Sequence, residues 1–188
     1  MASLVSNAKR REMDVNRAIP TFLAFLAAMI LSFGLTSPLA AQPKQTIGAS
    51  GNPIPRFISI RDDKALMRTG PGRQYPIKWV FKRKYLPLEV VAEYDVWRQV
   101  RDNEGAMGWM HSQLFIRGGR RFAVIRGKTR SLFRDKSLDS PIAITAEAGV
   151  IGEIIACEGI WCQINIQDHT AWIERRHLWG IYKNEVVK

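Results

Sequence analysis

The side chains that most often carry catalysis are few in this sequence and stand apart from one another. The chain of 188 residues has three histidines, His111, His169 and His177, and none of them lies in a nucleophile or metal-binding signature. His169 follows Asp168 in a predicted hairpin turn, where a solvent-exposed residue is expected. There is also no glycine-rich phosphate loop and no isolated carboxylate pair. We therefore expect no enzyme, no metal site and no cofactor.

The two cysteines, Cys157 and Cys162, bracket a segment that predicts a β-hairpin. Gly159-Ile160 fits a two-residue type II′ turn, which requires glycine at its first position. Counting outward from this turn places Cys157 opposite Cys162 at a non-hydrogen-bonded position, where Cα atoms lie about 4.5 Å apart and a disulfide can form. The pattern therefore predicts one intramolecular disulfide rather than a redox or nucleophilic cysteine.

Positive charge is concentrated in the middle of the chain. The formal net charge is +11, and residues 117–134 hold seven basic side chains and no acid. Such a run is either a solvated face that maintains solubility or a surface that attracts anionic polymers or lipid headgroups in a salt-sensitive way. Residues 82–84 are also basic and would extend this face. The basic side chains of the segment are Arg117, Arg120, Arg121, Arg126, Lys128, Arg130 and Arg134.

The first 41 residues have the layout of an export signal. Basic residues precede an uncharged apolar run, Ile19 to Leu35, and small residues follow up to Ala41. The run is at the border between a signal core and a spanning helix, so residues 1–41 are predicted to be a signal peptide or an uncleaved membrane anchor. In both cases the rest of the chain is periplasmic or otherwise extracytoplasmic. Nucleic acid is not met there, so the positive charge favours cell-wall or envelope polymers, or a periplasmic protein, as partners.

Short alternating runs dominate the rest of the chain. Residues 42–55 are rich in Gln, Gly, Ser and Pro and are predicted to be a flexible linker. Beyond them, apolar and polar residues alternate between turn residues, as they do from Tyr75 to Phe81, and no window has a sustained helical pattern. This periodicity predicts an all-β, largely antiparallel fold.

The sequence also repeats itself at an offset of 63 to 66 residues. A steady offset over several anchors predicts two tandem small barrels, residues 56–117 and 120–182. The anchors include Arg56-Phe57 with Arg121-Phe122, Leu66-Met67-Arg68 with Leu132-Phe133-Arg134, Trp97 with Trp161, and Trp109-Met110 with Trp172-Ile173.

One pair of positions tests this alignment. The equivalents of Cys157 and Cys162 in the first copy are Glu93 and Arg98, which carry opposite charges. We therefore expect a cross-strand ion pair in the first copy at the site of the disulfide in the second.

The first copy contains the turn Gly70-Pro71-Gly72, then a strand centred on Trp97, then Gly108-Trp109. This string resembles the bacterial Src homology 3 (SH3) domain family, and the resemblance covers residues 57–179. The glycines of the turn are expected to supply positive φ angles. The second copy departs from the family pattern, since Asp135-Lys136-Ser137 stands in place of Thr69-Gly70-Pro71 in this alignment. The resemblance implies two SH3-like barrels that bind cell-wall peptides or other envelope ligands.

Aromatic residues supply the candidate binding site. Four tryptophans, Trp97, Trp109, Trp161 and Trp172, are expected to fill the cores or ends of the barrels. In eukaryotic relatives of this fold an aromatic groove receives a proline-rich peptide. The aromatic side chains near loops that would line such a groove are Tyr75, Trp79, Tyr85 and Tyr94.

Taken together, these features predict an exported, non-catalytic SH3-like binding or adaptor protein of the cell envelope that recognises peptidoglycan or another anionic component. The alternative is a membrane-tethered scaffold or signalling accessory that binds another protein through the aromatic groove. In that case the chain would contact the membrane only through an uncleaved N-terminal segment.

Overall fold

The computed structural model describes residues 46–118 and 122–187, which contain fifteen β-strands, two short 3-10 helices and no α-helix. The predicted all-β fold is confirmed. The predicted export segment, residues 1–41, lies outside these residues. Within the described part of the chain, no helix is long and apolar enough to cross a membrane.

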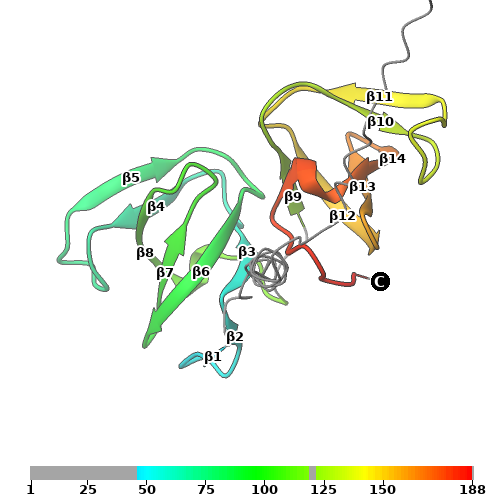
Figure 1. Cartoon of the computed structure of the whole chain (residues 1–188). Helices are drawn as coiled ribbons and strands as arrows, with labels where there is room; N and C mark the ends of the chain where they lie inside the picture. Colours follow the sequence, from blue (N-terminus) through cyan, green and yellow to red (C-terminus); the bar gives the residue numbers. More distant parts are fainter. Residues whose placement is uncertain (1–45, 119–121, 188) are drawn as a thin grey trace, which may run out of the picture. The chain divides into compact units, whose positions relative to one another are not determined.

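The first barrel is a six-stranded antiparallel sheet in the order β3-β6-β7-β8-β4-β5 (Figure 1). Its inward-facing side chains are almost completely buried, as Met67, Val100 and Met110 show at 0 to 1% exposure. The strands are β3 (Arg56–Ser59), β4 (Ala65–Arg68), β5 (Ile77–Phe81), β6 (Pro87–Tyr94), β7 (Trp97–Arg101) and β8 (Met107–His111), followed by the 3-10 helix η1 (Ser112–Leu114).

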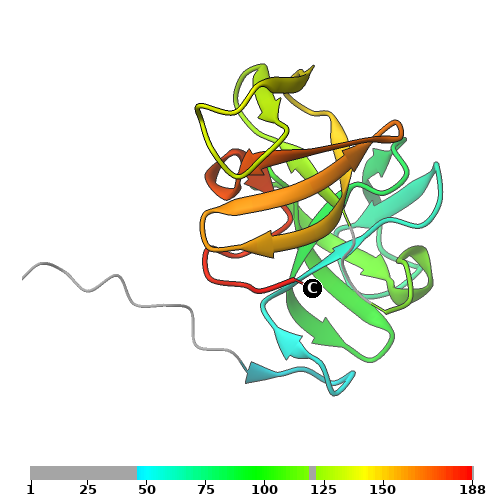
Figure 2. The same ribbon diagram turned by 90° about the vertical axis from the view of Figure 1, so that its right-hand side faces the viewer.

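The second barrel is a seven-stranded sheet in the order β11-β10-β14-β13-β12-β9-β15. Its strands curl around a core that includes Leu132, Ile164 and Ile173, and Figures 1 and 2 show the curl from two directions. The elements are β9 (Phe122–Ile125), β10 (Arg130–Phe133), β11 (Ile142–Ala146), β12 (Ile151–Glu158), β13 (Trp161–Ile166), β14 (His169–Glu174), the 3-10 helix η2 (Arg175–His177) and β15 (Leu178–Trp179).

The segment predicted as a flexible linker contains a small hairpin instead. Strands β1 (Thr46–Ile47) and β2 (Pro53–Ile54) pair with each other. The turn between them is held by Glu93 of the first barrel, which accepts hydrogen bonds from the Ser50 N–H at 2.7 Å and the Ser50 hydroxyl at 2.9 Å. A tertiary contact to a buried carboxylate therefore orders a segment whose own composition favours disorder.

The predicted disulfide is confirmed. Cys157 and Cys162 are cross-strand partners with their Cα atoms 4.1 Å apart. Glu93 and Arg98 occupy the same register in the first barrel, and their side chains form an ion pair at 3.1 Å. Burial alone would raise the pKa of Glu93, but hydrogen bonds from Ser50 and Arg56 outweigh it and leave this pKa below its ordinary value.

The strand register corrects one anchor of the repeat alignment. Arg68 pairs with Trp109, and Phe133 pairs with Trp172. Because Trp109 and Trp172 are equivalent, Arg68 corresponds to Phe133, not to Arg134. The alignment matched residue types at this strand. It therefore paired inward-facing residues of one copy with outward-facing residues of the other, an error of one residue in register.

The loop after this strand shifts with it. Gly70-Pro71-Gly72 corresponds to Asp135-Lys136-Ser137, rather than to the segment one residue later. In both loops the N–H of the third of these residues donates to the carbonyl of the first, at 3.0 Å in the first barrel and 2.8 Å in the second. The two loops therefore have one backbone conformation at this turn and different side chains.

Aromatic side chains also join the two barrels, which belong to one compact unit. The Phe57 ring lies 5.1 Å from the Trp179 ring and 4.7 Å from the Tyr182 ring. The Tyr182 hydroxyl donates to Glu89 of the first barrel at 3.0 Å, and burial together with that carboxylate raises the Tyr182 pKa. Val124 of the second barrel completes the core of the first.

Candidate functional site

The outward face of β7 and β8 carries the large aromatic side chains of the first barrel. Trp97 lies opposite His111, and Gln99 lies opposite Trp109. The residues that alternate with them, including Met110, point into the core. The four tryptophans that were expected to fill the cores or ends of the barrels belong to neither core cluster, although Trp97 is nearly buried.

A groove of about 550 Å³ lies on this face, around Trp97. Trp97 is only 9% exposed, because the His111 ring packs edge-on against it with the ring centroids 5.4 Å apart. Three lining side chains are basic, and no lining residue is acidic. The groove therefore combines an apolar floor with a cationic rim. Its lining residues are Lys64, Leu66, Arg68, Arg73, Trp97, His111, Gln113 and Leu114.

Arg68 is held in place by the loop that follows it. Its Nη1 donates to the Tyr75 carbonyl at 2.7 Å. Gly70 makes this loop possible, since a Cβ atom there would lie 2.5 Å from the Tyr75 ring. Neither Gly70 nor Gly72 has a positive φ, so the expectation that the turn needs them for that reason is wrong. Gly70 supplies space for the ring instead.

His111 caps the 3-10 helix at the other side of the groove. Its Nδ1 accepts the Gln113 N–H at 3.2 Å. In the neutral ring the proton is then on Nε2, which remains a hydrogen-bond donor. The side chain thus serves as a wall for Trp97 and as a polar group of the groove.

A second hollow of about 360 Å³ lies around Trp109 on the same face. Thr69 and Lys78 line it, and Lys78 donates to the Met107 carbonyl at 2.7 Å. Because Arg68 lines the first hollow and Thr69 the second, the two meet along the end of β4. Each hollow has one tryptophan among its lining residues, Trp97 in the first and Trp109 in the second.

The structure does not bring the four predicted aromatic residues into this groove. Tyr75 packs against Gly70, and Tyr85 stacks on Phe122 of the second barrel with the rings 4.2 Å apart. Trp79 and Tyr94 are 56% and 63% exposed and line neither hollow.

Sequence reasoning missed the basic residues of the groove as well as the outward direction of Trp97. The available signal was the period of two along β4, β7 and β8. Leu66, Arg68 and Trp109 alternate with buried residues and so share the outer face of the sheet, and Trp97 joins them as the cross-strand partner of His111.

The basic segment 117–134 is only partly described, because Arg120 and Arg121 lie outside the described residues. Arg130 is half-buried. The burial of His177 lowers the pKa of that histidine, and the positive charge of Arg130 lowers it further. Arg83, which belongs to the basic run 82–84, donates to the Gly149 carbonyl of the second barrel at 2.7 Å. The exposed members are Arg117, Arg126, Lys128 and Arg134.

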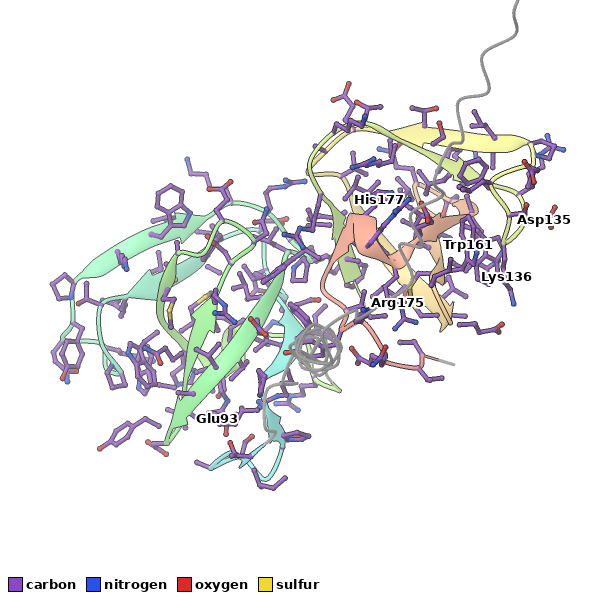
Figure 3. All side chains as sticks on the ribbon, viewed as in Figure 1. Glu93, Asp135, Lys136, Trp161, Arg175 and His177 are labelled. Carbon is purple, nitrogen blue, oxygen red and sulfur yellow. A yellow bond between two sulfur atoms is a disulfide. The ribbon has the colours of Figure 1, made fainter. Side chains whose placement is uncertain are left out.

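The second barrel has different residues at the groove positions. Phe133 replaces Arg68 and packs edge-on against Trp161, with the ring centroids 6.0 Å apart. Glu174 replaces His111 as the cross-strand partner of the tryptophan. Figure 3 labels Trp161 in this barrel, beside Asp135 and Lys136. The cationic groove is thus a property of the first barrel.

No group of three or more His, Cys, Asp or Glu side chains within residues 46–118 and 122–187 is placed to hold a metal ion.

Comparison with known proteins identifies the repeats. A family profile described as bacterial SH3 domain matches residues 61–115 and 127–180, which together are more than half of the chain. No curated protein matches the sequence. Among solved structures, NlpC2 from Trichomonas vaginalis is 10% identical with a TM-score of 0.32, over 77% of this chain and 51% of that one. An NlpC/P60 family protein from Bacillus cereus ATCC 10987 is 12% identical with a TM-score of 0.30, over 65% and 55%. The chain spans about half the length of these structures.

Proposed function

Because this chain belongs to the bacterial SH3 domain family, we propose that it is a non-catalytic binding module of the cell envelope, and that it holds a carboxylate-bearing cell-wall peptide on the outer face of its first barrel. The observation that carries this proposal is the groove around Trp97, with its apolar floor and its basic rim. A peptide that presents both a carboxylate and an apolar stretch matches both parts of that surface.

The chemistry of the rim favours carboxylates. A guanidinium group offers planar paired donors that fit a carboxylate, and Arg68 and Arg73 supply two such groups. The Arg68 contact to the Tyr75 carbonyl reduces the freedom that this side chain would lose on binding. An aromatic floor such as Trp97 adds apolar contact area beside the charges.

The disulfide supports the proposed location. Disulfides persist mainly in oxidising compartments, and the Cys157–Cys162 bond accounts for both cysteines of the chain. Export through residues 1–41 belongs to the same proposal.

Sedimentation with purified peptidoglycan tests the function. We expect the protein lacking residues 1–41 to sediment with peptidoglycan at physiological salt and to be released in part at high salt, because screening weakens the contribution of the rim. The variant Arg73→Ser removes one rim charge and should reduce retention, whereas Arg61→Ser removes a charge that pairs with Asp62 outside the groove and should not. Absence of retention at both salt concentrations would remove the proposal.

A second candidate function rests on the edge strand β5. This strand has only one neighbour in its sheet and exposes Ile77 and Trp79, at 50% and 56%. An apolar sheet edge can accept a strand of another protein. A membrane-tethered scaffold would use this edge, and N-terminal sequencing of the mature protein separates the two candidates, because an uncleaved N-terminus favours the scaffold.

A further inference from the structure

The Lys136 side chain lies over an aromatic ring on the outer face of the second barrel. Its Nζ atom is 4.8 Å from the centroid of the Trp172 ring, and it forms an ion pair with Glu158. The lysine comes from the loop between β10 and β11, the tryptophan from β14 and the glutamate from the end of β12. Three separate elements therefore converge on one ammonium group, at the edge where Figure 3 labels Lys136 and Trp161.

The loop backbone does not explain the presence of a lysine. Lys136 corresponds to Pro71 of the first barrel, and the turn hydrogen bond across it is the same in both loops. The first barrel forms the same turn with an uncharged proline at this position. The lysine is thus a substitution of side-chain chemistry on an unchanged backbone.

Other positions of this face also differ from their equivalents in the first barrel. Glu158 pairs with Trp161 across the hairpin just as Tyr94 pairs with Trp97, so an acid replaces a phenol. Leu138 stands at the loop position of Arg73. The face lacks the arginines of the first barrel's rim and has a carboxylate beside a tryptophan, which is an environment that binds a cation.

We infer that the surface formed by Trp172 and Glu158 is a second binding site, which accepts a primary ammonium group of a peptide, and that Lys136 occupies it when no ligand is bound. The site lies on the other barrel and has the opposite charge preference, so it goes beyond the function proposed above. The lysine can leave without unfolding the barrel, because the Lys136 and Glu158 side chains are 43% and 62% exposed.

The test uses Nα-acetyl-lysine amide as the probe and the NMR signal of the Trp172 indole N–H as the readout. Lys136→Met removes the competing ammonium group and keeps the length of the side chain. An internal competitor on a short tether acts at an effective concentration in the millimolar range, so we expect the variant to bind the probe about tenfold more tightly than the parent protein. Lys128→Met removes an exposed charge elsewhere on the same barrel and should bind the probe with the same affinity as the parent protein.

Two further measurements ask whether binding requires both the ammonium group of the probe and the carboxylate of Glu158. The norleucine analogue of the probe has the same chain without the ammonium group and should not shift the Trp172 signal. Adding Glu158→Gln to Lys136→Met should remove the gain in affinity, while Arg68→Phe in the first barrel should leave it intact, whatever the fate of the peptidoglycan proposal. Equal affinity of the parent and Lys136→Met, or equal binding of the norleucine analogue, would overturn the inference. Lys136→Gln, a second uncharged replacement, should repeat the result of the methionine variant.

Discussion

The two barrels have the same strand register but different side chains at equivalent positions. In the first, Glu93 faces Arg98 at the end of the long hairpin, whereas in the second Cys157 faces Cys162. On the outer face, Arg68 of the first barrel becomes Phe133 in the second. The backbone pairing is preserved while the charges are exchanged or removed. The shared fold therefore fixes the direction in which each side chain points, whereas the residue type at that position determines its interactions in each copy.

The largest expected effect concerns the hairpin of the first barrel. The Glu93 side chain is 1% exposed and holds Arg56, Arg98 and Ser50, so Glu93→Gln leaves two partly buried guanidinium groups without their counter-ion. We expect the free energy of unfolding to fall by about 3 kcal/mol, measured by urea denaturation. Glu104→Gln, at an exposed position of the same barrel, is the matched control and should change it by less than about 0.5 kcal/mol. A loss below about 1 kcal/mol for Glu93→Gln would show that the ion pair is not the counterpart of the disulfide.

The same carboxylate makes the first barrel sensitive to acid. Its pKa is lowered in the folded protein, so its contribution is present above the unfolded pKa of about 4.3 and is lost as the pH falls through the folded pKa. Glu93→Gln should flatten this part of the profile of stability against pH.

The disulfide of the second barrel should contribute less. The bond closes a short loop, with a sequence separation of 5, and the chain-entropy relation gives about 2 kcal/mol for such a loop. We expect the double variant Cys157→Ser, Cys162→Ser to lose about that amount in the same urea experiment. Adding a reductant to the parent protein should reproduce the loss, and a reductant without effect would contradict it.

Exchanging the equivalent outer-face residues Arg68 and Phe133 should change the free energy of ligand binding by less than the stability changes above. Arg68→Phe introduces the residue of the second barrel and should weaken peptidoglycan-fragment binding about tenfold, or about 1.4 kcal/mol, because a charge-assisted contact is lost. Phe133→Arg is the reciprocal variant and should leave that affinity unchanged. If the reciprocal variant weakened binding and Arg68→Phe did not, the assignment of the two faces would be reversed.

The smallest expected effect is a pH dependence of stability from His177 in η2, which has no counterpart in η1. Burial and the charge of Arg130 lower the pKa of His177, and Glu174 opposes the shift only in part. The unfolded chain then binds more protons than the folded one between the lowered pKa and about 6.5, so stability should decline as the pH falls through this window. Leu114 is the equivalent residue of η1 and does not titrate. Urea midpoints measured for the parent and for His177→Gln should show the decline in the parent alone.

Much of the fold was predictable because it depends on patterns that neighbouring residues repeat. Strand periodicity and the tandem offset predicted an all-β fold of two copies, turn counting predicted the Cys157–Cys162 pair, and the repeat alignment predicted its ionic counterpart. Each of these depends on local register, which a two-residue period specifies strongly.

The candidate site was less predictable because it depends on the face of each strand. Trp97 was assigned to the core or end of a barrel by residue type, although its register opposite His111 places it on the outer face, where the His111 ring covers it. The one-residue error at Arg68 concealed the exchange of an arginine for a phenylalanine. The hairpin at residues 46–54 could not be predicted either, since it depends on Ser50 meeting a carboxylate 43 residues away in the sequence.

The six tryptophans allow one direct measurement of the central claim, that the outer face of the first barrel binds the cell-wall ligand and the matching face of the second does not. In an NMR titration of the indole N–H signals with a soluble, carboxylate-bearing peptidoglycan fragment whose amino groups are all acetylated, we expect Trp97 and Trp109 to shift with one common affinity while Trp161 and Trp172 stay in place. Shifts of Trp161 and Trp172 without shifts of Trp97 and Trp109 would contradict the account.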